Sequence, residues 1–421
     1  MIKFKENIKP YKVLLQNFTS LSILQISNYV FPIITLPYVV RVLGPEKYGL
    51  VNFAGAFCAY FITLSDYGFN LSATRLVSLN RNEQIELDKI FSSVLVVKIL
   101  LGLLSFGIVL MLILFVELFK TDALLYLISF ASIISSILFP GWFFQGLEKM
   151  KIIPVINILP KIFGVILIFL LINEPSDYLN FVIINSSVQV CIGAAGLIVA
   201  LKSFRVHFYV PNLKEIKFQF RDGLQLFKST LAINLYTNSN TFLLGLLTNN
   251  EIVGYYSAAD KIRIFFQSLL TPVSQSVFPF VNYLMKESKE KLINFNKMLL
   301  KFQAIIGLAI SMSIFIWADW ITVFVLGKEY LDSVLILKII GWLPFVIALS
   351  NIYGIQLMLP LGFDKQFFKV VAIAAIINLC LIILLVPQYQ AVGIAIATLV
   401  AEIFVSASFI IFLARKGERL I

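Results

Sequence analysis

This sequence of 421 residues has very little of the chemistry on which metal centres and histidine-based catalysis depend. It contains one histidine, His207, and its three cysteines lie in apolar runs without paired spacing. The sequence therefore has almost no residues that could form a zinc site or a Ser-His-Asp triad. We expect no disulfide, no metal and no other cofactor. A phosphate-binding loop, a zinc-binding helix and a Gly-x-Ser-x-Gly motif are also missing from the sequence. These absences argue against an enzyme and against a nucleotide-driven pump.

Charged residues are scarce as well. They make up 14% of the chain, whereas 59% of the residues are hydrophobic and the mean hydropathy is +0.92. These values lie far outside the range of a soluble globular domain and predict a membrane protein. The net charge of +11 does not indicate a nucleic-acid partner, because the cations are scattered between apolar runs and form no basic stripe.

Twelve predominantly apolar runs are long enough to cross a hydrocarbon core of about 30 Å as helices, so the sequence predicts an all-α membrane protein. The basic segment before the first run lacks a cleavage-site pattern, and we expect it to be retained. The predicted spans are residues 13–40, 49–70, 91–116, 123–144, 152–172, 179–201, 229–247, 252–282, 298–325, 334–360, 367–386 and 390–413.

Lysine and arginine are concentrated on one side of this topology. One side holds 24 lysines and arginines, if Lys369 in the first turn of the eleventh span is counted with it. In chain order, the seven segments on this side hold four, three, two, six, four, two and three. The connections on the other side hold only four: Arg41, Lys47, Lys120 and Lys328. Because basic loops stay in the cytoplasm, we expect both termini to be cytoplasmic.

The longest basic connection divides the twelve spans into two groups of six. We expect an N-terminal lobe of residues 1–201, a cytoplasmic linker of residues 202–228 and a C-terminal lobe of residues 229–421. In the first span, Pro32 and Pro37 each remove a backbone hydrogen bond, which predicts a kinked or broken helix. The prolines are either tolerated by neighbouring helices or used as a hinge, and the sequence favours neither interpretation.

The two halves resemble each other. At a shift of 205 residues, Glu46 and Gly49 align with Glu251 and Gly254, and at a shift of 216 residues GLEK (146–149) aligns with GFDK (362–365). Six spans per half is an even number, so the repeats run in the same direction around an axis along the membrane normal. We therefore expect two six-helix lobes around a central cleft that can open to either side.

The stretch from Gly254 to Arg263, GYYSAADKIR, places three charges inside a predicted span. A charge near the bilayer centre costs about 2.5–3.5 kcal/mol on insertion scales, so this stretch is expected to face protein or a water-filled cavity. Asp260 and Arg263 are three residues apart and can meet on one helical face. That pairing leaves Lys261 without a local partner, which makes its ammonium the best candidate for binding an anionic cargo.

For other charged side chains inside the spans, the sequence leaves more than one role open. Lys161 either packs against protein or faces the cleft, and Glu402 is either a protonatable coupling group or the partner of a lysine. Asp66 either caps the chain where it leaves the membrane or takes part in gating. Three more charges are expected mainly to reach the nearest membrane surface: Lys98, Asp319 and Lys338.

The seventh predicted span opens with LAINLYTNSNTF, which contains Asn234, Asn238 and Asn240. Side-chain amides in a membrane can join neighbouring helices by hydrogen bonds. They can equally bind the hydroxyl groups of a sugar. The spacing of four and two residues does not decide between helix packing and cargo binding.

Five segments resemble a known family of bacterial O-antigen and polysaccharide repeat-unit flippases, which belongs to the multidrug, oligosaccharidyl-lipid and polysaccharide exporter superfamily. The resemblance covers nearly the whole chain in order. The segments are NYVFPIITLPYVVRVLGPEKYG (28–49), SDYGFNLSATR (65–75), LFPGWFFQGLEKMK (138–151), AADKIRIFFQSLLTPVSQSVFP (258–279) and SNIYGIQLMLP (350–360).

The resemblance implies two six-helix lobes around a V-shaped, cation-rich cavity. It also implies a cargo, an undecaprenyl-diphosphate-linked oligosaccharide moved from the cytoplasmic to the periplasmic leaflet of the inner membrane. We expect a monomer in contact with membrane lipid, with a polysaccharide polymerase and a chain-length regulator as candidate partners. The candidate substrate-binding residues are Lys261, Arg263, Lys161, Arg41, Asn234 and Asn238. The candidate coupling or gating residues are Asp260, Glu402, Asp66, Pro32 and Pro37.

Three other functions fit the sequence less well. A drug or metabolite antiporter of the same superfamily would share the fold, but an antiporter of cationic drugs usually has an acidic cavity, and here basic residues outnumber acidic ones within the spans. A membrane-bound polysaccharide polymerase or ligase needs a sizeable outer loop, and every predicted outer loop has about ten residues or fewer. A passive scaffold would not need charges at membrane depth.

Overall fold

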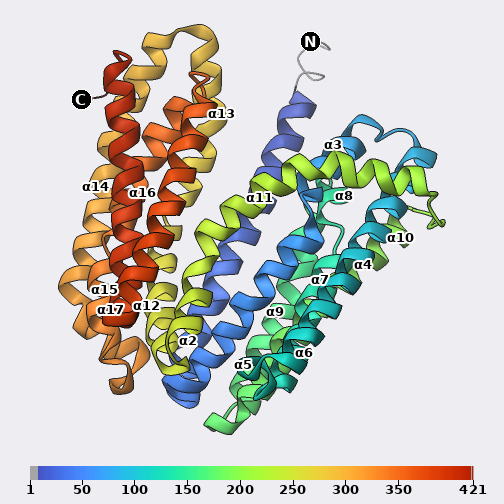
Figure 1. Cartoon of the computed structure of the whole chain (residues 1–421). Coiled ribbons are helices and arrows are strands. Elements are labelled where there is room, and N and C mark those ends of the chain that lie inside the picture. The colour runs from blue at the N-terminus through green and yellow to red at the C-terminus, as the bar shows by residue number, and fades with distance from the viewer. Residues whose placement is uncertain (1–7, 419, 421) are drawn as a thin grey trace. The chain divides into compact units, whose positions relative to one another are not determined.

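The computed structural model describes residues 8–418 and 420, and Figure 1 shows the chain. For residues 8–18, 21, 229, 232, 233, 235–238, 275, 276 and 279 only the backbone is described. Over the described residues the regular structure is helical, with no strand. Helices satisfy every backbone hydrogen bond within one segment, which hydrocarbon requires because it offers no water as a partner. The predicted all-α class is confirmed.

The chain divides into two compact units. Unit 1 consists of residues 1–35 and 54–238, and unit 2 consists of residues 36–53 and 239–421. Two helices pass from one unit into the other: α2 (Ile8–Asp66) and α11 (Leu213–Leu247). The remaining elements of unit 1 are α3 (Phe69–Leu79), α4 (Gln84–Phe115), α5 (Glu117–Lys120), α6 (Ala123–Ser129), α7 (Ala131–Leu138), α8 (Gly141–Gly146), α9 (Ile152–Leu171), η1 (Pro175–Asp177) and α10 (Tyr178–Ser203).

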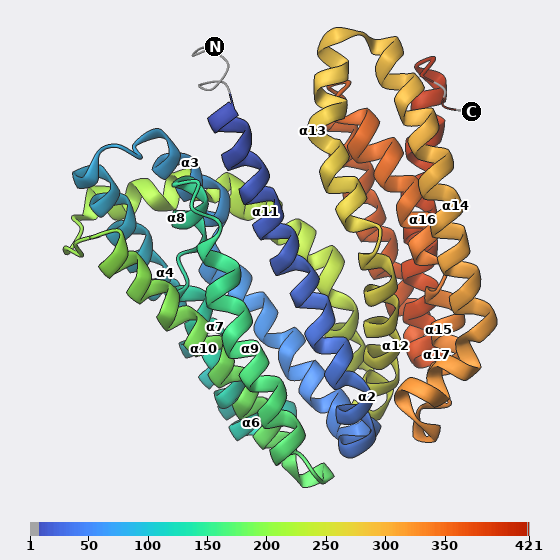
Figure 2. The same cartoon turned by 180° about the vertical axis from the view of Figure 1, so that it is seen from behind.

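Unit 2 is built on the long helices α14 and α17, which pack with α15 and α16 in both views of the chain (Figures 1 and 2). Its buried core contains aliphatic and aromatic side chains, including Leu292 of α14, Tyr353 of η4 and Phe409 of α17. The elements of unit 2 are α12 (Asn250–Ser268), α13 (Thr271–Glu287), α14 (Lys289–Ile321), η2 (Thr322–Leu326), η3 (Lys328–Tyr330), α15 (Ser333–Ile340), α16 (Leu343–Ser350), η4 (Asn351–Met358) and α17 (Asp364–Arg415).

Eight helical stretches in the described part of the chain are long and apolar enough to cross a membrane. Two of them each contain two predicted spans, because the chain turns inside α2 at Gly44 (φ 69°) and inside α17 at Gln390 (φ 49°). The eight stretches therefore account for ten of the twelve predicted spans. The other two, residues 229–247 and 252–282, form parts of α11, α12 and α13 and hold the polar stretches singled out in the sequence.

The division into units differs from the predicted lobes. Residues 202–228 do not form a separate linker, because α11 begins at Leu213 and continues as one helix to Leu247. The described backbone is also not interrupted at Pro32 or Pro37, so the helix is not broken there, and a kink at these prolines stays a prediction. However, α2 passes from unit 1 to unit 2 between Thr35 and Leu36, and the two prolines flank this point.

The corner between α2 and α3 is held against the first part of α11. Tyr67 (φ 44°) and Gly68 (φ 76°) both have left-handed backbone conformations, which turn the chain sharply at the end of α2. The ring of Tyr67 stacks on Phe227 with 4.7 Å between ring centroids. An ion pair of 2.6 Å joins Arg75 of α3 to Asp222 of α11. These contacts attach the start of α11 to unit 1.

Residues 36–53 belong to unit 2 because α2 and α12 cross there without side chains between their backbones. A Cβ atom on Gly49 would overlap the backbone carbonyl oxygen of Asn250, and a Cβ atom on Gly254 would overlap that of Pro45. Residues 49 and 254, and residues 45 and 250, are both related by the repeat shift of 205. The crossing is therefore reciprocal, and glycine at both positions permits the close approach.

Candidate functional site

The charged stretch predicted from the sequence lies in the middle of α12. This helix starts at a capped end, where the side chain of Asn249 accepts a hydrogen bond of 3.0 Å from the backbone N–H of Ile252. Residues 253–259 are all buried, and the charges follow directly after them. The sequence GYYSAA thus packs the first half of α12 into unit 2 and brings Asp260 to the end of that packed region.

Asp260 and Arg263 form the ion pair that their spacing predicts, with 2.7 Å between Oδ1 and Nε. Both side chains are largely buried, at 22% and 13% exposed. Arg263 also donates a hydrogen bond from Nη1 to Gln267 on the next turn, and it interacts electrostatically with Glu402 of α17. Two carboxylates and an amide therefore surround one guanidinium, which lowers the cost of placing it in the membrane.

Lys261 is arranged differently. Its side chain is exposed, and no hydrogen bond or ion pair joins it to another described residue. Lys261 follows Gly254 by seven residues, so the two lie within about 20° on the same face of α12 and about 10 Å apart along its axis. The glycine crossing with α2 therefore lies about two turns before an exposed, unpaired ammonium group, on the same face of α12.

One amide group of the seventh predicted span, that of Asn240, takes part in unit 2. Asn240 is buried and donates to the hydroxyl groups of Thr398 at 2.8 Å and Tyr256 at 3.3 Å. The side-chain amide of Asn378 donates a hydrogen bond to the side-chain oxygen Oδ1 of Asn240 at 3.2 Å. This network joins α11, α12 and α17, which is the helix-packing interpretation of Asn240. Sequence reasoning missed Asn378 and Thr398, whose only signal is a polar residue in an otherwise apolar run.

Three more candidates lie on the helices that pass between the units: Asn234 and Asn238 on α11, and Arg41 on α2. Asn234 is half-buried, and the side chain of Asn238 lies outside the described residues. Arg41 lies on α2 near the glycine crossing, where its guanidinium donates a hydrogen bond to the backbone carbonyl of Phe324. This contact ties η2 to α2 within unit 2. It places Arg41 at the outer end of unit 2, which we define by the connecting residues 44–46, 248–250, 327–332 and 387–390.

Unit 1 holds a second charged group at membrane depth. The ammonium of Lys98 is 2.9 Å from Asp66 Oδ1 and donates a hydrogen bond of 2.6 Å to the carbonyl oxygen of Ser136. The hydroxyl of Ser136 donates to the same carboxylate oxygen at 2.9 Å. The expectation that Lys98 extends to the membrane surface is wrong, because its side chain is 2% exposed.

Asp66 does not cap the following helix. The N-cap residue of α3 is Gly68, and no side-chain hydrogen bond caps that end. The carboxylate of Asp66 instead accepts hydrogen bonds from Lys98 of α4 and Ser136 of α7. The capping interpretation is therefore wrong, and the gating interpretation stays a prediction.

Lys161 of α9 is half-buried, and its ammonium donates a hydrogen bond to the side-chain carbonyl of Asn28 on α2. Asn28 is itself exposed, and it precedes Pro32 by about one turn. This contact places the cation beside the proline-containing part of α2 within unit 1. The structure brings Lys161 to the same helix as the two prolines, and its role in cargo binding stays a prediction.

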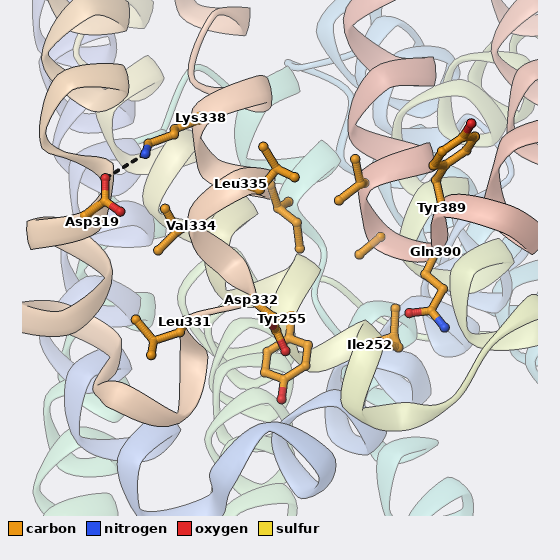
Figure 3. A pocket seen from close by; sticks show the side chains of 13 residues that line it. Ile252, Tyr255, Asp319, Leu331, Asp332, Val334, Leu335, Lys338, Tyr389 and Gln390 are labelled. Atoms are coloured by element: carbon orange, nitrogen blue, oxygen red, sulfur yellow. Dashed lines mark ion pairs between the residues drawn. The ribbon is translucent and has the colours of Figure 1, made fainter.

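A cavity of about 610 Å³ opens at the outer end of unit 2 and contains none of the predicted site residues. Figure 3 shows Asp319 and Lys338 on one wall and Tyr389 and Gln390 on the opposite wall. Asp319 and Lys338 form an ion pair of 2.7 Å between α14 and α15, so these two charges pair with each other rather than extend separately to the surface. The other lining residues are Ile252, Tyr255, Leu331, Asp332, Val334, Leu335, Ile336, Ala391 and Val392.

The sequence is similar to known proteins over nearly its whole length. The family model of polysaccharide biosynthesis proteins matches residues 14–285. A putative O-antigen transporter of Escherichia coli strain K12 is 31% identical over 397 residues, which cover 94% of this chain and 96% of the relative. A putative O-antigen transporter of Shigella dysenteriae is 31% identical over 392 residues, covering 93% and 97%. Both relatives are named as transporters, in agreement with the expectation of a protein that is not an enzyme.

Solved structures share the fold. An inward-facing multidrug resistance transporter of the MATE family, from the MOP superfamily, aligns with a TM-score of 0.72 at 11% identity and covers 95% of this chain and 98% of its own. The lipid II flippase MurJ in an inward closed conformation aligns with a TM-score of 0.69 at 17% identity, covering 96% and 87%. The predicted superfamily fold is confirmed, and the protein is a multi-pass membrane protein.

Proposed function

The chain belongs to the polysaccharide biosynthesis protein family, and on that premise we propose that it is a flippase for an undecaprenyl-diphosphate-linked oligosaccharide. The cargo would be the repeat unit of an O-antigen or capsule, moved from the cytoplasmic to the periplasmic leaflet. The names of the two relatives, putative O-antigen transporters, support this cargo class. The observation that carries the proposal is the exposed ammonium of Lys261 within a predicted span. The two charged residues beside it, Asp260 and Arg263, already form an ion pair with each other.

The chemistry of this cargo fits the charges of the chain. A polyprenyl tail can stay in lipid, whereas the diphosphate must leave water and needs cations to replace its hydration. Lys261 is available for this role, because the neighbouring carboxylate of Asp260 is paired with Arg263. Lys161 and Arg41 are the further cations of the proposed pathway, and Asn234 and Asn238 are proposed to bind sugar hydroxyl groups. The basic character of these candidates disfavours an antiporter of cationic drugs.

We place the protein in the bacterial inner membrane with twelve crossings and both termini in the cytoplasm. The asymmetry of 24 to four basic residues supports this orientation. In this topology the glycine crossing of α2 and α12 is periplasmic, and Lys261 lies on its cytoplasmic side. Cargo bound at Lys261 then leaves to the periplasm only when this crossing separates.

Alternating access is proposed to use the helices that pass between the units. Pro32 and Pro37 flank the point where α2 leaves unit 1, so missing backbone hydrogen bonds lie where bending is needed. Asp66 lies at the end of the same helix, in the ion pair with Lys98, and is proposed to take part in gating there. Asp260 and Glu402 are the proposed coupling groups, because protonation of either carboxylate weakens its attraction for Arg263.

Transport of the lipid-linked repeat unit tests this function directly. In a strain that lacks this gene, repeat units should accumulate on the cytoplasmic leaflet, and the intact gene should restore surface polysaccharide.

Lys261→Ala should lower surface polysaccharide by roughly tenfold or more at matched protein levels, since a lost charge-assisted bond costs about 1.5–3 kcal/mol. Lys261→Arg should retain much of the activity because it keeps the charge.

Lys301→Ala is a suitable control, because Lys301 is an exposed cation on α14 outside the charged stretch. Adding a proton ionophore to the same assay tests coupling to the proton gradient. The ionophore should slow flipping if Asp260 and Glu402 act as proposed. Normal surface polysaccharide from Lys261→Ala at wild-type abundance would move the cargo site away from α12, with Lys161 as the next candidate. Failure of the intact gene to restore the deletion would reject the flippase itself.

A further inference from the structure

The cavity at the outer end of unit 2 has an excess of negative charge. Two carboxylates, Asp319 and Asp332, and one ammonium, Lys338, line it. Lys338 pairs with Asp319, whereas Asp332 is exposed and forms no ion pair with any described residue. A ligand with a positive group is therefore favoured at Asp332. The ammonium of Lys338 has three donors, of which the pair with Asp319 uses only one, so it can also bind an anionic oxygen.

These two binding positions are ordered along the axis of α15. Asp332 directly precedes α15, in the connection at the outer end, and Lys338 follows it by six residues. Six residues of helix place Lys338 about 9 Å deeper along the axis. A phospholipid in this leaflet has the same order, because the headgroup amine lies farther from the hydrocarbon than the phosphate.

Most of the remaining lining residues are aliphatic, and two of these are exposed. Leu331 and Leu335 line the cavity and are 56% and 54% exposed. Trp317 and Trp320 on the neighbouring helix α14 are also exposed, as expected of side chains at a membrane interface. An aliphatic lining suits glycerol and the first methylene groups of acyl chains rather than an oligosaccharide. The faces of tyrosine rings favour a cationic amine, and Tyr255 and Tyr389 line opposite parts of the cavity (Figure 3).

We propose that this cavity binds the zwitterionic headgroup of a phospholipid that carries a primary amine, with the amine at Asp332 and the phosphate at Lys338. The leaflet in which the lipid lies rests on the proposed topology, whereas the binding chemistry does not depend on the cargo or on flipping. A lipid at this position contacts α12, α14, α15 and α17 together, and so it stabilises the outer end of unit 2.

Native mass spectrometry of the purified full-length protein tests the proposal. The protein is titrated with phosphatidylethanolamine, phosphatidylcholine and phosphatidylglycerol of identical acyl chains, and the bound fraction is measured for each lipid. Phosphatidylethanolamine should bind most tightly, because its amine donates hydrogen bonds to a carboxylate and the choline group does not. Asp332→Asn should weaken this binding about tenfold, the scale of one lost charge-assisted hydrogen bond.

Two further variants separate this site from general lipid contact. Glu329→Gln removes an exposed acid three residues from Asp332 that does not line the cavity, and it should leave phosphatidylethanolamine binding unchanged. Leu335→Trp places a bulky side chain at a partly exposed wall, which fills the cavity without removing a charge, and it should lower the bound fraction. Equal binding of the three lipids, tighter binding of phosphatidylglycerol, or unchanged binding in both Asp332→Asn and Leu335→Trp would overturn the proposal.

Discussion

Lys98 shows how a single charged side chain is accommodated inside the membrane. It is 2% exposed, and Asp66 and Ser136 supply the acceptors that its ammonium needs. In soluble proteins, removing one partner of a buried ion pair costs about 3–5 kcal/mol, because the other charge stays buried without compensation. Asp66 is 25% exposed, so the lower part of this range applies to the loss of Lys98.

A double-mutant cycle measures this interaction. We expect Lys98→Met and Asp66→Asn each to lower the thermal unfolding temperature of the detergent-purified protein. The combined variant Asp66→Asn/Lys98→Met should be more stable than either single variant, since it leaves no buried charge without a partner. Additive losses in the combined variant would show that the two residues stabilise unit 1 independently.

Sequence spacing predicted local charge pairs and missed the distant ones. Asp260 and Arg263 are three residues apart on one helix, so helical geometry alone brings them together. Lys98 and Asp66 are 32 residues apart, and their pairing depends on how α2, α4 and α7 pack. Without tertiary packing, a lone charge near a span end indicates extension to the membrane surface, which is wrong for Lys98.

At the scale of helices, the crossing of α2 and α12 depends on two positions without side chains. A side chain at Gly49 or Gly254 would overlap the backbone of the opposite helix, so the crossing cannot form with a larger residue at either position. Ser257 lies about one turn inward of Gly254 and is 5% exposed. It is therefore well placed to report whether the crossing is closed.

We expect Gly49→Leu to hold α2 and α12 apart at their crossing and to abolish flipping. In a background without the three native cysteines, Ser257→Cys should resist a membrane-impermeant maleimide added from the periplasmic side. The same cysteine should react when Gly49→Leu is also present.

Gly55→Leu is the matched control on the same helix, because a Cβ atom there meets no other atom within 4 Å. This variant should keep Ser257→Cys protected and should leave flipping near the wild-type level. Normal flipping by Gly49→Leu at wild-type abundance would show that the crossing does not need to close during transport.

The apolar helices were predictable because their length and hydropathy follow from the thickness of the bilayer. The polar part of α11 was not. Residues 213–228 alternate charged and apolar side chains, which looks like a surface linker in sequence. In the structure its inner side chains pack on the corner of α2 and α3, where a Cβ atom on Gly68 would come within 2.9 Å of Leu226. Such a contact joins residues that are more than 150 positions apart and leaves no local sequence signal.

For the whole molecule, the proposed topology can be tested without knowing the cargo. Reporter fusions after Asn173 and Asn249 should read periplasmic, and a fusion after Asn212 should read cytoplasmic, because basic residues are concentrated in the segments assigned to the cytoplasm. Asn249 is the most informative position, since it lies between the two predicted spans that are richest in polar residues. A cytoplasmic signal there would reverse or remove one crossing of the second half.

The reciprocal glycine contact also bears on the origin of the chain. Gly49 meets residue 250 and Gly254 meets residue 45, which is the pattern of an isologous interface, in which two identical surfaces pair around a two-fold axis. If the halves arose by duplication of one gene, the ancestral six-helix protein was a parallel homodimer that met its own copy at this glycine. One glycine then served both sides of that interface, and after fusion each half had to keep its own copy. The charges deeper in the membrane are not part of this reciprocal contact, and they differ between the halves: Asp66 and Lys98 in one, and Asp260, Lys261 and Arg263 in the other.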